Sequence, residues 1–148
     1  MYYLILAAVL IAADQLLKYM VVSFIGTEGQ IQIFGEFLSL TYIRNDGIAL
    51  GMFSGMQSVV IVITSVIMLA IAVYILREYK RRSKVELTLL TVIVSGGIGN
   101  LIDRIRFGYV VDYINFGVWH YIFNFADICV VLGCIGLFIH VFFMSKEN

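Results

Sequence analysis

Four long runs of apolar residues divide the chain, and each is long enough to cross a membrane as a helix. The run at 58–76 carries no charged residue, and nineteen helical residues extend about 28 Å, close to the thickness of a bilayer core. We therefore predict an all-α membrane protein of one domain. Its four transmembrane helices are expected at approximately 3–25, 58–76, 87–105 and 125–144.

A different pattern fills the segment 26–57, between the first two runs. Residues 30–34 alternate polar and apolar side chains, and residues 37–43 are rich in β-branched and aromatic types. Both patterns are typical of strands. We predict a small β-sheet between helices 1 and 2, with its apolar face on the membrane surface. Residues 44–47, Arg-Asn-Asp-Gly, have the composition of a turn that ends the last strand.

A cluster of positive charge indicates the orientation. It comprises five basic residues within eight positions: Arg77, Lys80, Arg81, Arg82 and Lys84. Such a cluster is also compatible with nucleic acid or lipid headgroups, but between two spanning helices it is typical of a short cytoplasmic loop. We therefore predict a cytoplasmic loop at 77–86, extracytoplasmic segments at 26–57 and 106–124, and both termini in the cytoplasm.

The second outer segment is expected to be a loop with an interfacial belt of aromatic side chains. The belt residues are Tyr109, Tyr113, Phe116, Trp119 and Tyr121.

Composition agrees with a membrane protein. Hydrophobic residues make up 61% of the 148 residues and charged residues 14%, against roughly 45–50% and about 25% in soluble domains. The net charge is zero, which gives no indication of a nucleic-acid partner. Cys129 and Cys134 lie in an apolar run and are expected to be packing residues. Neither they nor His120 and His140 have a metal-binding spacing, so we predict no metal and no cofactor.

Polar residues are concentrated between residues 96 and 127, beside two of the most apolar runs. Unpaired polar groups are costly in a membrane, so this concentration suggests a site at the membrane edge. The residues in question are Asn100, Asp103, Arg104, Asp112, Asn124 and Asp127. Asn100, Asp103 and Arg104 fall on one helical face. Asp14 and Lys18, four residues apart, are placed to form an ion pair.

Each of these signals also has a purely structural interpretation. Asn45 is compatible with an ordinary turn residue, and Asn124 or Asp127 with a helix N-cap. The glycines at 96, 97 and 99 are compatible with close helix packing. Asp103 and Arg104 could mark a helix end, and Asp14 with Lys18 a structural pair.

Two carboxylates expected at the outer face, Asp112 and Asp127, suggest paired acid–base chemistry. Two neighbouring carboxyl groups do not both ionise easily, so one retains a proton while the other can accept one from water. The spacing of fifteen residues does not itself bring them together. A transporter using the charged residues in the helices, or a structural scaffold, is a different class of function that these residues also allow.

At this level of detail the chain resembles the bacterial lipoprotein signal peptidase (type II signal peptidase) family. The resemblance rests on five segments in order: Asp14-Gln15-x-x-Lys18, Asn45-x-Gly47-x-Ala49-x-Gly51, residues 96–104, Val111-Asp112-Tyr113, and Phe123-Asn124-x-Ala126-Asp127. Leu50 and Ile128 depart from the family, which often has phenylalanine and serine there. These departures affect the substrate lining and not the expected chemistry.

The resemblance implies an aspartyl endopeptidase of the bacterial cytoplasmic membrane. It would cut lipidated prolipoproteins just before the lipid-bearing cysteine. The resemblance implies Asp112 and Asp127 as the catalytic pair. The expected binding and supporting residues are Asn45, Asn100, Arg104, Asn124, Asp103, Asp14, Lys18, Gly47 and Gly96. The expected partners are lipidated prolipoproteins and membrane lipid, without nucleic acid, and the protein is expected to act as a monomer.

Overall fold

The computed structural model describes residues 1–26, 29–47, 56–117 and 121–144. Its helices are α1 (Tyr2–Phe24), α2 (Gln57–Glu78), α3 (Lys84–Phe107) and α4 (Phe125–Ile139), the last continued by the short π-helix η2 (His140–Met144). Among the described residues, four helical segments are long and apolar enough to cross a membrane. The prediction of four such helices is confirmed, with boundaries that differ by three residues or fewer when η2 is counted with α4.

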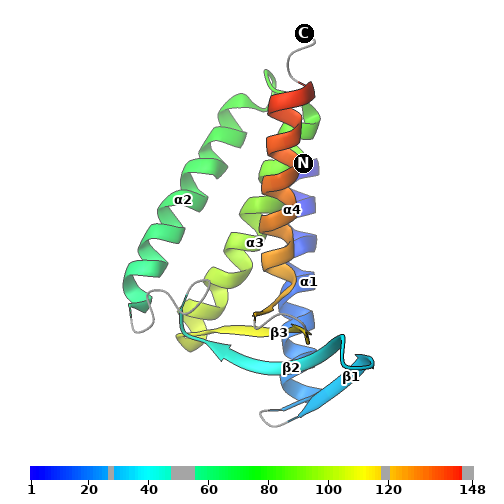
Figure 1. Ribbon diagram of the computed structural model, residues 1–148. Coiled ribbons are helices and arrows are strands. Elements are labelled where there is room, and N and C mark those ends of the chain that lie inside the picture. Colours follow the sequence, from blue (N-terminus) through cyan, green and yellow to red (C-terminus); the bar gives the residue numbers. More distant parts are fainter. Residues whose placement is uncertain (27–28, 48–55, 118–120, 145–148) are drawn as a thin grey trace.

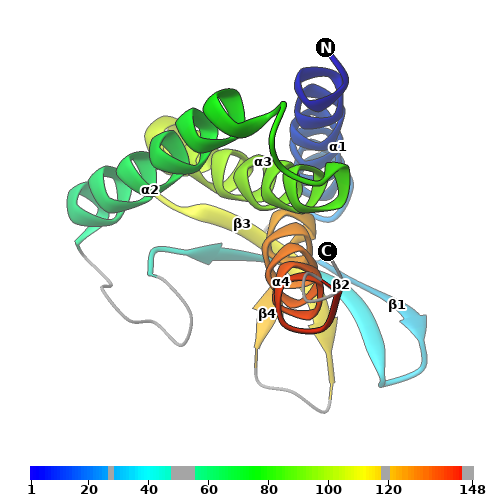
Figure 2. The same cartoon turned by 90° about the horizontal axis from the view of Figure 1, so that it is seen from above.

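Helix α3 forms the centre of the bundle and packs against α1, α2 and α4 (Figures 1 and 2). In α3, 56% of the apolar 18-residue stretch is buried inside the protein, against 11–17% of the corresponding stretch in the other three helices. Three glycines explain this packing, because each faces a different neighbour. A Cβ atom on Gly96 would collide with the Ala126 carbonyl of α4, one on Gly97 with Met68 of α2, and one on Gly99 with Asp14 of α1.

An antiparallel sheet covers one end of the bundle (Figure 1). Its strands are β1 (Gln30–Phe34), β2 (Leu38–Asn45), β3 (Val110–Phe116) and β4 (Ile122–Phe123), paired in the order β1-β2-β3-β4. Strands β1 and β2 lie at the two segments between the first two helices where the sequence indicated strands. The prediction of a loop for the second outer segment is wrong, because β3 and β4 complete the sheet from the connection between α3 and α4.

Local signals in the sequence end α3 and begin α4 close to the sheet. Gly108 follows α3 with φ 78°, a left-handed conformation that favours glycine and ends the helix. The chain then enters β3, turns back through β4, and starts α4 at Phe125 with Asn124 as N-cap. The start of α1, the connection from α2 to α3, and η2 lie at the opposite end of the bundle (Figure 1).

Candidate functional site

The sheet brings Asn45 to Asp112, although 67 residues separate them in the chain. Asn45 pairs with Val110 across β2 and β3, and Asp112 lies two residues further along, on the same face of its strand. The Asn45 side-chain amide donates a hydrogen bond of 2.7 Å to Asp112 Oδ2. Asn45 is also a turn residue, because its Oδ1 accepts the Gly47 backbone N–H at 3.0 Å. The structural and site interpretations of Asn45 therefore both hold geometrically.

Asn124 joins the two carboxyl groups predicted as a pair. Its side-chain nitrogen donates to Asp112 Oδ1 at 2.6 Å, and its backbone nitrogen donates to Asp127 Oδ2 at 3.2 Å. Asn124 and Asp127 also form a reciprocal capping box at the start of α4. The hairpin of β3 and β4 returns the chain to this position, so that Asp112 on the sheet and Asp127 on α4 share one fully buried partner.

Asn100 of α3 holds the remaining oxygen of Asp127. Its side-chain amide donates to Asp127 Oδ1 at 2.8 Å. Its own Oδ1 accepts two hydrogen bonds, from Lys18 Nζ at 2.9 Å and from Asn124 Nδ2 at 3.1 Å. Because two donors fix the oxygen of this amide, its nitrogen is directed toward Asp127.

Behind Asn100 lies a buried charge cluster, which we call the Lys18 cluster and define as Asp14, Gln15, Lys18 and Asp103. Lys18 Nζ lies 2.9 Å from a carboxylate oxygen of Asp14 and 2.9 Å from one of Asp103. The three charged residues are at most 3% exposed. Gln15 donates to both carboxylates. The expected ion pair of Asp14 and Lys18 is present, extended by Asp103.

The Lys18 cluster also holds backbone segments together. Asp14 Oδ1 accepts the Ala126 backbone N–H at 3.1 Å, and Asp103 Oδ2 accepts the Val111 backbone N–H at 3.1 Å. Ala126 precedes Asp127, and Val111 precedes Asp112. The cluster therefore fixes the backbone next to each member of the predicted pair.

Arg104 connects α3 to the end of β2. Its guanidinium donates to the Gly47 carbonyl at 3.0 Å, and its buried Nε has no hydrogen-bond partner among the described residues.

Several residues named in the sequence analysis lie outside the described ranges. These are Ala49, Leu50, Gly51, Trp119 and His120.

A pocket of about 560 Å³ opens on the two carboxyl groups. Its polar end is lined by Asn45, Asn100, Arg104, Asp112 and Asp127. Its other walls come mainly from α2 and α4, including Val60, Met68, Ile128, Val131 and Leu132. Helices α2 and α4 diverge toward the end of the bundle that carries the sheet (Figure 1). Val131 and Leu132 are more than half exposed, so the apolar part of the pocket opens sideways, where a bilayer would lie.

The electrostatic surroundings of Asp112 favour retention of a proton. Burial, followed by the charge of Asp127, raises the pKa of Asp112 from its ordinary value of 3.8 to about 6, against the lowering effect of hydrogen bonds from Asn45 and Asn124. The charge of Lys18 acts in the opposite direction and lowers the pKa of Asp112. Lys18 is already shared by Asp14 and Asp103, which leaves Arg104 as the cation that lines the pocket with two carboxyl groups.

The structure brings all the predicted site residues into one connected region, with Gly96 at the packing contact between α3 and α4. Sequence reasoning assigned no site role to two participants, Gln15 and Tyr113. Gln15 donates to three acceptors, including the Gly99 carbonyl, and its signal in the sequence was its place in the segment Asp14-Gln15-x-x-Lys18. The Tyr113 hydroxyl accepts the Phe125 backbone N–H at 3.3 Å.

In the described part of the chain, no three His, Cys, Asp or Glu side chains are grouped to hold a metal ion.

Comparison with known proteins gives consistent results. A family model for signal peptidase (SPase) II matches residues 6–143. The chain is 39% identical over 143 residues to a lipoprotein signal peptidase of Halothermothrix orenii, covering 96% of each chain. It is 36% identical over 150 residues to one of Fusobacterium nucleatum, covering 100% of this chain and 91% of the relative. A solved bacterial membrane enzyme superposes with a TM-score of 0.87 at 29% identity, over 99% of this chain and 90% of the other.

Proposed function

This chain belongs to the signal peptidase II family, and from that membership we propose that it is an aspartic endopeptidase that cuts lipidated prolipoproteins immediately before the lipid-modified cysteine. The observation that carries the proposal is the pairing of Asp112 and Asp127 through Asn124, at the polar end of a pocket with apolar walls. Membership in a peptidase family favours this function over a transporter or a scaffold.

The two carboxyl groups take different roles in the proposed reaction. Asp112 holds the proton, since burial and the neighbouring charge raise its pKa. Asp127 is the base. It lies in the first turn of α4, where the helix dipole stabilises negative charge, and Asn100 orients one of its oxygens.

The chemical steps follow from these roles. Asp127 removes a proton from water as the oxygen attacks the scissile carbonyl carbon, and Asp112 gives its proton to the carbonyl oxygen. As the tetrahedral intermediate collapses, Asp127 transfers its proton to the departing cysteine nitrogen, and Asp112 recovers a proton from the hydroxyl group. The products are a signal peptide with a new carboxyl terminus and a lipoprotein with a free α-amino group.

The apolar walls of the pocket suit a substrate that is itself held in the bilayer. A lipid chain on the cysteine and the apolar part of the signal peptide can enter between α2 and α4, where Met68 and Leu132 line the pocket. Anchoring confines the substrate to two dimensions and sets the depth of the scissile bond, which lowers the entropic cost of positioning it. Arg104 and Asn45, at the polar end, are placed to contact the substrate backbone.

The proposed orientation places the sheet and the pocket on the extracytoplasmic side, with both termini in the cytoplasm. The basic cluster and the sheet lie at opposite ends of the bundle, which supports this topology. A cysteine at Gln32 in β1 should react with an impermeant thiol reagent applied outside, in a variant without Cys129 and Cys134, whereas a cysteine at Arg81 should not. The opposite labelling would reverse the topology.

The function is tested with a purified precursor whose cysteine carries diacylglycerol, compared with the same precursor carrying serine at that position. Mass spectrometry of the products should show one cut, directly before the lipidated cysteine, and no cleavage of the serine form. Cleavage at another bond, or equal cleavage of both precursors, would contradict the proposed specificity.

A further inference from the structure

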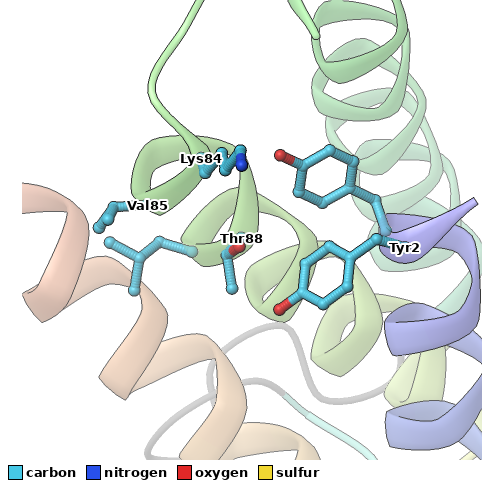
Figure 3. Close-up of a pocket in the computed structure, with 6 residues that line it drawn as sticks. Tyr2, Lys84, Val85 and Thr88 are labelled. Carbon is cyan, nitrogen blue, oxygen red and sulfur yellow. The ribbon is translucent and has the colours of Figure 1, made fainter.

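A second pocket lies at the end of the bundle farthest from Asp112. It has a volume of about 550 Å³ and is formed by the first turn of α1 and the first turns of α3 (Figure 3). Its lining residues are Tyr2, Tyr3, Lys84, Val85, Thr88 and Leu89. Asn100 is eleven residues beyond Leu89 along α3, a separation of about 16 Å, so this pocket is separate from the proposed peptidase site.

The lining combines a cation and hydroxyl groups with an apolar wall. Figure 3 shows Lys84, Val85 and Thr88 on the α3 side and Tyr2 on the α1 side. Lys84 supplies a positive charge, while the tyrosines and Thr88 supply hydroxyl groups that can donate hydrogen bonds. Val85 and Leu89 supply apolar surface. This pairing of a polar edge with an apolar wall matches a molecule with an anionic head and a hydrocarbon tail.

The positive charge of Lys84 is not neutralised by its nearest acidic neighbour in sequence. Glu86 accepts a hydrogen bond of 2.9 Å from the Tyr74 hydroxyl, and it lies 4.0 Å from Arg82, which also lies 4.0 Å from Glu78. Lys84 forms no ion pair within the described ranges. The segment 77–86 contains five basic and two acidic residues, so the surroundings of the pocket carry net positive charge.

We propose that this pocket binds an anionic glycerophospholipid of the surrounding leaflet. The phosphate lies against Lys84 and the neighbouring hydroxyl groups, and one acyl chain lies along Val85 and Leu89. Basic pockets between transmembrane helices at the cytoplasmic side are suited to such headgroups. The start of α3 adds to the attraction, because a helix N-terminus carries partial positive charge.

The test measures lipid retention on the intact protein by native mass spectrometry, with phosphatidylglycerol and phosphatidylcholine of identical acyl chains. The wild type should retain phosphatidylglycerol in preference to phosphatidylcholine. Lys84→Gln should reduce that preference roughly fivefold, as expected for one lysine near an anionic headgroup. Lys80→Gln is the matched control, because Lys80 is an exposed lysine of the same basic segment that does not line the pocket.

Three outcomes would overturn the proposal. One is a wild-type protein with no headgroup preference. Another is an equal loss in Lys84→Gln and Lys80→Gln, which would indicate non-specific attraction to the whole basic segment. The third is displacement of the lipid by millimolar inorganic phosphate, which would identify a soluble anion as the ligand. Cleavage of the precursor in lipid-free detergent should be unchanged in Lys84→Gln, so this result is independent of the peptidase proposal.

Discussion

The Lys18 cluster and the pair of Asp112 and Asp127 lie side by side and share Asn100, yet they treat negative charge differently. In the cluster, two carboxylates surround one lysine and both accept backbone N–H groups. In the pair, amide groups and one backbone N–H hold the oxygens, and both residues line a pocket. We therefore expect the carboxylates sealed against Lys18 to serve the fold, and those held by neutral donors at the pocket to exchange protons.

The largest change in stability is expected from removing the cation of the cluster. Lys18→Met leaves Asp14 and Asp103 buried without their shared charge, which should lower the free energy of unfolding by about 3–5 kcal/mol. Asp14→Asn should cost less, because Lys18 keeps Asp103 as a partner, and it should affect stability more than turnover. Denaturant unfolding in detergent measures both changes. Wild-type stability in Lys18→Met would show that the cluster does not support the fold.

A smaller loss is expected where a glycine makes room for the cluster. A Cβ atom at Gly99 would lie 2.6 Å from Asp14 Oδ2, a group held by ion pairing, so Gly99→Ala should cost about 1–3 kcal/mol. Gly136→Ala is the matched control, because its Cβ would meet the flexible end of Leu89 at 2.7 Å. Thermal unfolding should distinguish the two variants. Equal losses would indicate that general helix packing, and not the cluster, sets the cost.

The pH dependence of cleavage tests the proton on Asp112. Activity should fall as the pH rises through about 6, because Asp112 loses the proton that it donates. The Asn45 hydrogen bond favours the ionised form, so Asn45→Ala should raise the pKa of Asp112 and move this fall in activity to higher pH. The pH of the fall is a property of Asp112 and Asp127 titrating as a unit. Ser39→Ala, which removes a different hydrogen bond of β2, should leave the pH of this fall unchanged. A fall at lower pH in Asn45→Ala would contradict the assignment of the proton to Asp112.

The sequence was sufficient for the features that depend on local pattern. Long, mainly apolar runs predicted the helices, and alternation predicted β1. Strand β3 was missed because residues 110–113 are all buried, which removes the alternation that marks a half-exposed strand. Its aromatic residues then favoured an interfacial loop.

The details of the site depend on features that no local pattern specifies. Asn45 reaches Asp112 only through the register of β2 and β3, which shifts between Leu40 and Ile43. The alternatives for Asn124 and Asp127 were posed as cap or site, whereas the structure shows a capping box made by residues that also line or join the candidate site. A cap and a reactive group are compatible here because Asp127 uses one oxygen for each contact.

Replacing each member of the pair tests the central proposal most directly, with turnover and stability measured on the same samples. Asp112→Asn and Asp127→Asn should each lower turnover by about 10²–10⁴-fold or more, and the double variant should lose little more than either. Stability of Asp112→Asn should change little, because the amide carries no buried charge but its NH2 group cannot accept one of the two hydrogen bonds that the Asp112 oxygens accept. A carboxyl whose pKa is raised by folding becomes less favourable to the fold as the pH rises from about 4 to about 6, and at neutral pH the amide avoids that cost.

Glu36→Gln, an exposed carboxyl in the turn between β1 and β2, is the control and should retain both turnover and stability. Abolished cleavage in folded single variants, without a further large loss in the double variant, is the result expected for an aspartic pair. If either single variant kept more than about a tenth of wild-type turnover, a barrier change of less than roughly 1.4 kcal/mol, the residue would be only a structural cap and the proposed mechanism would be wrong.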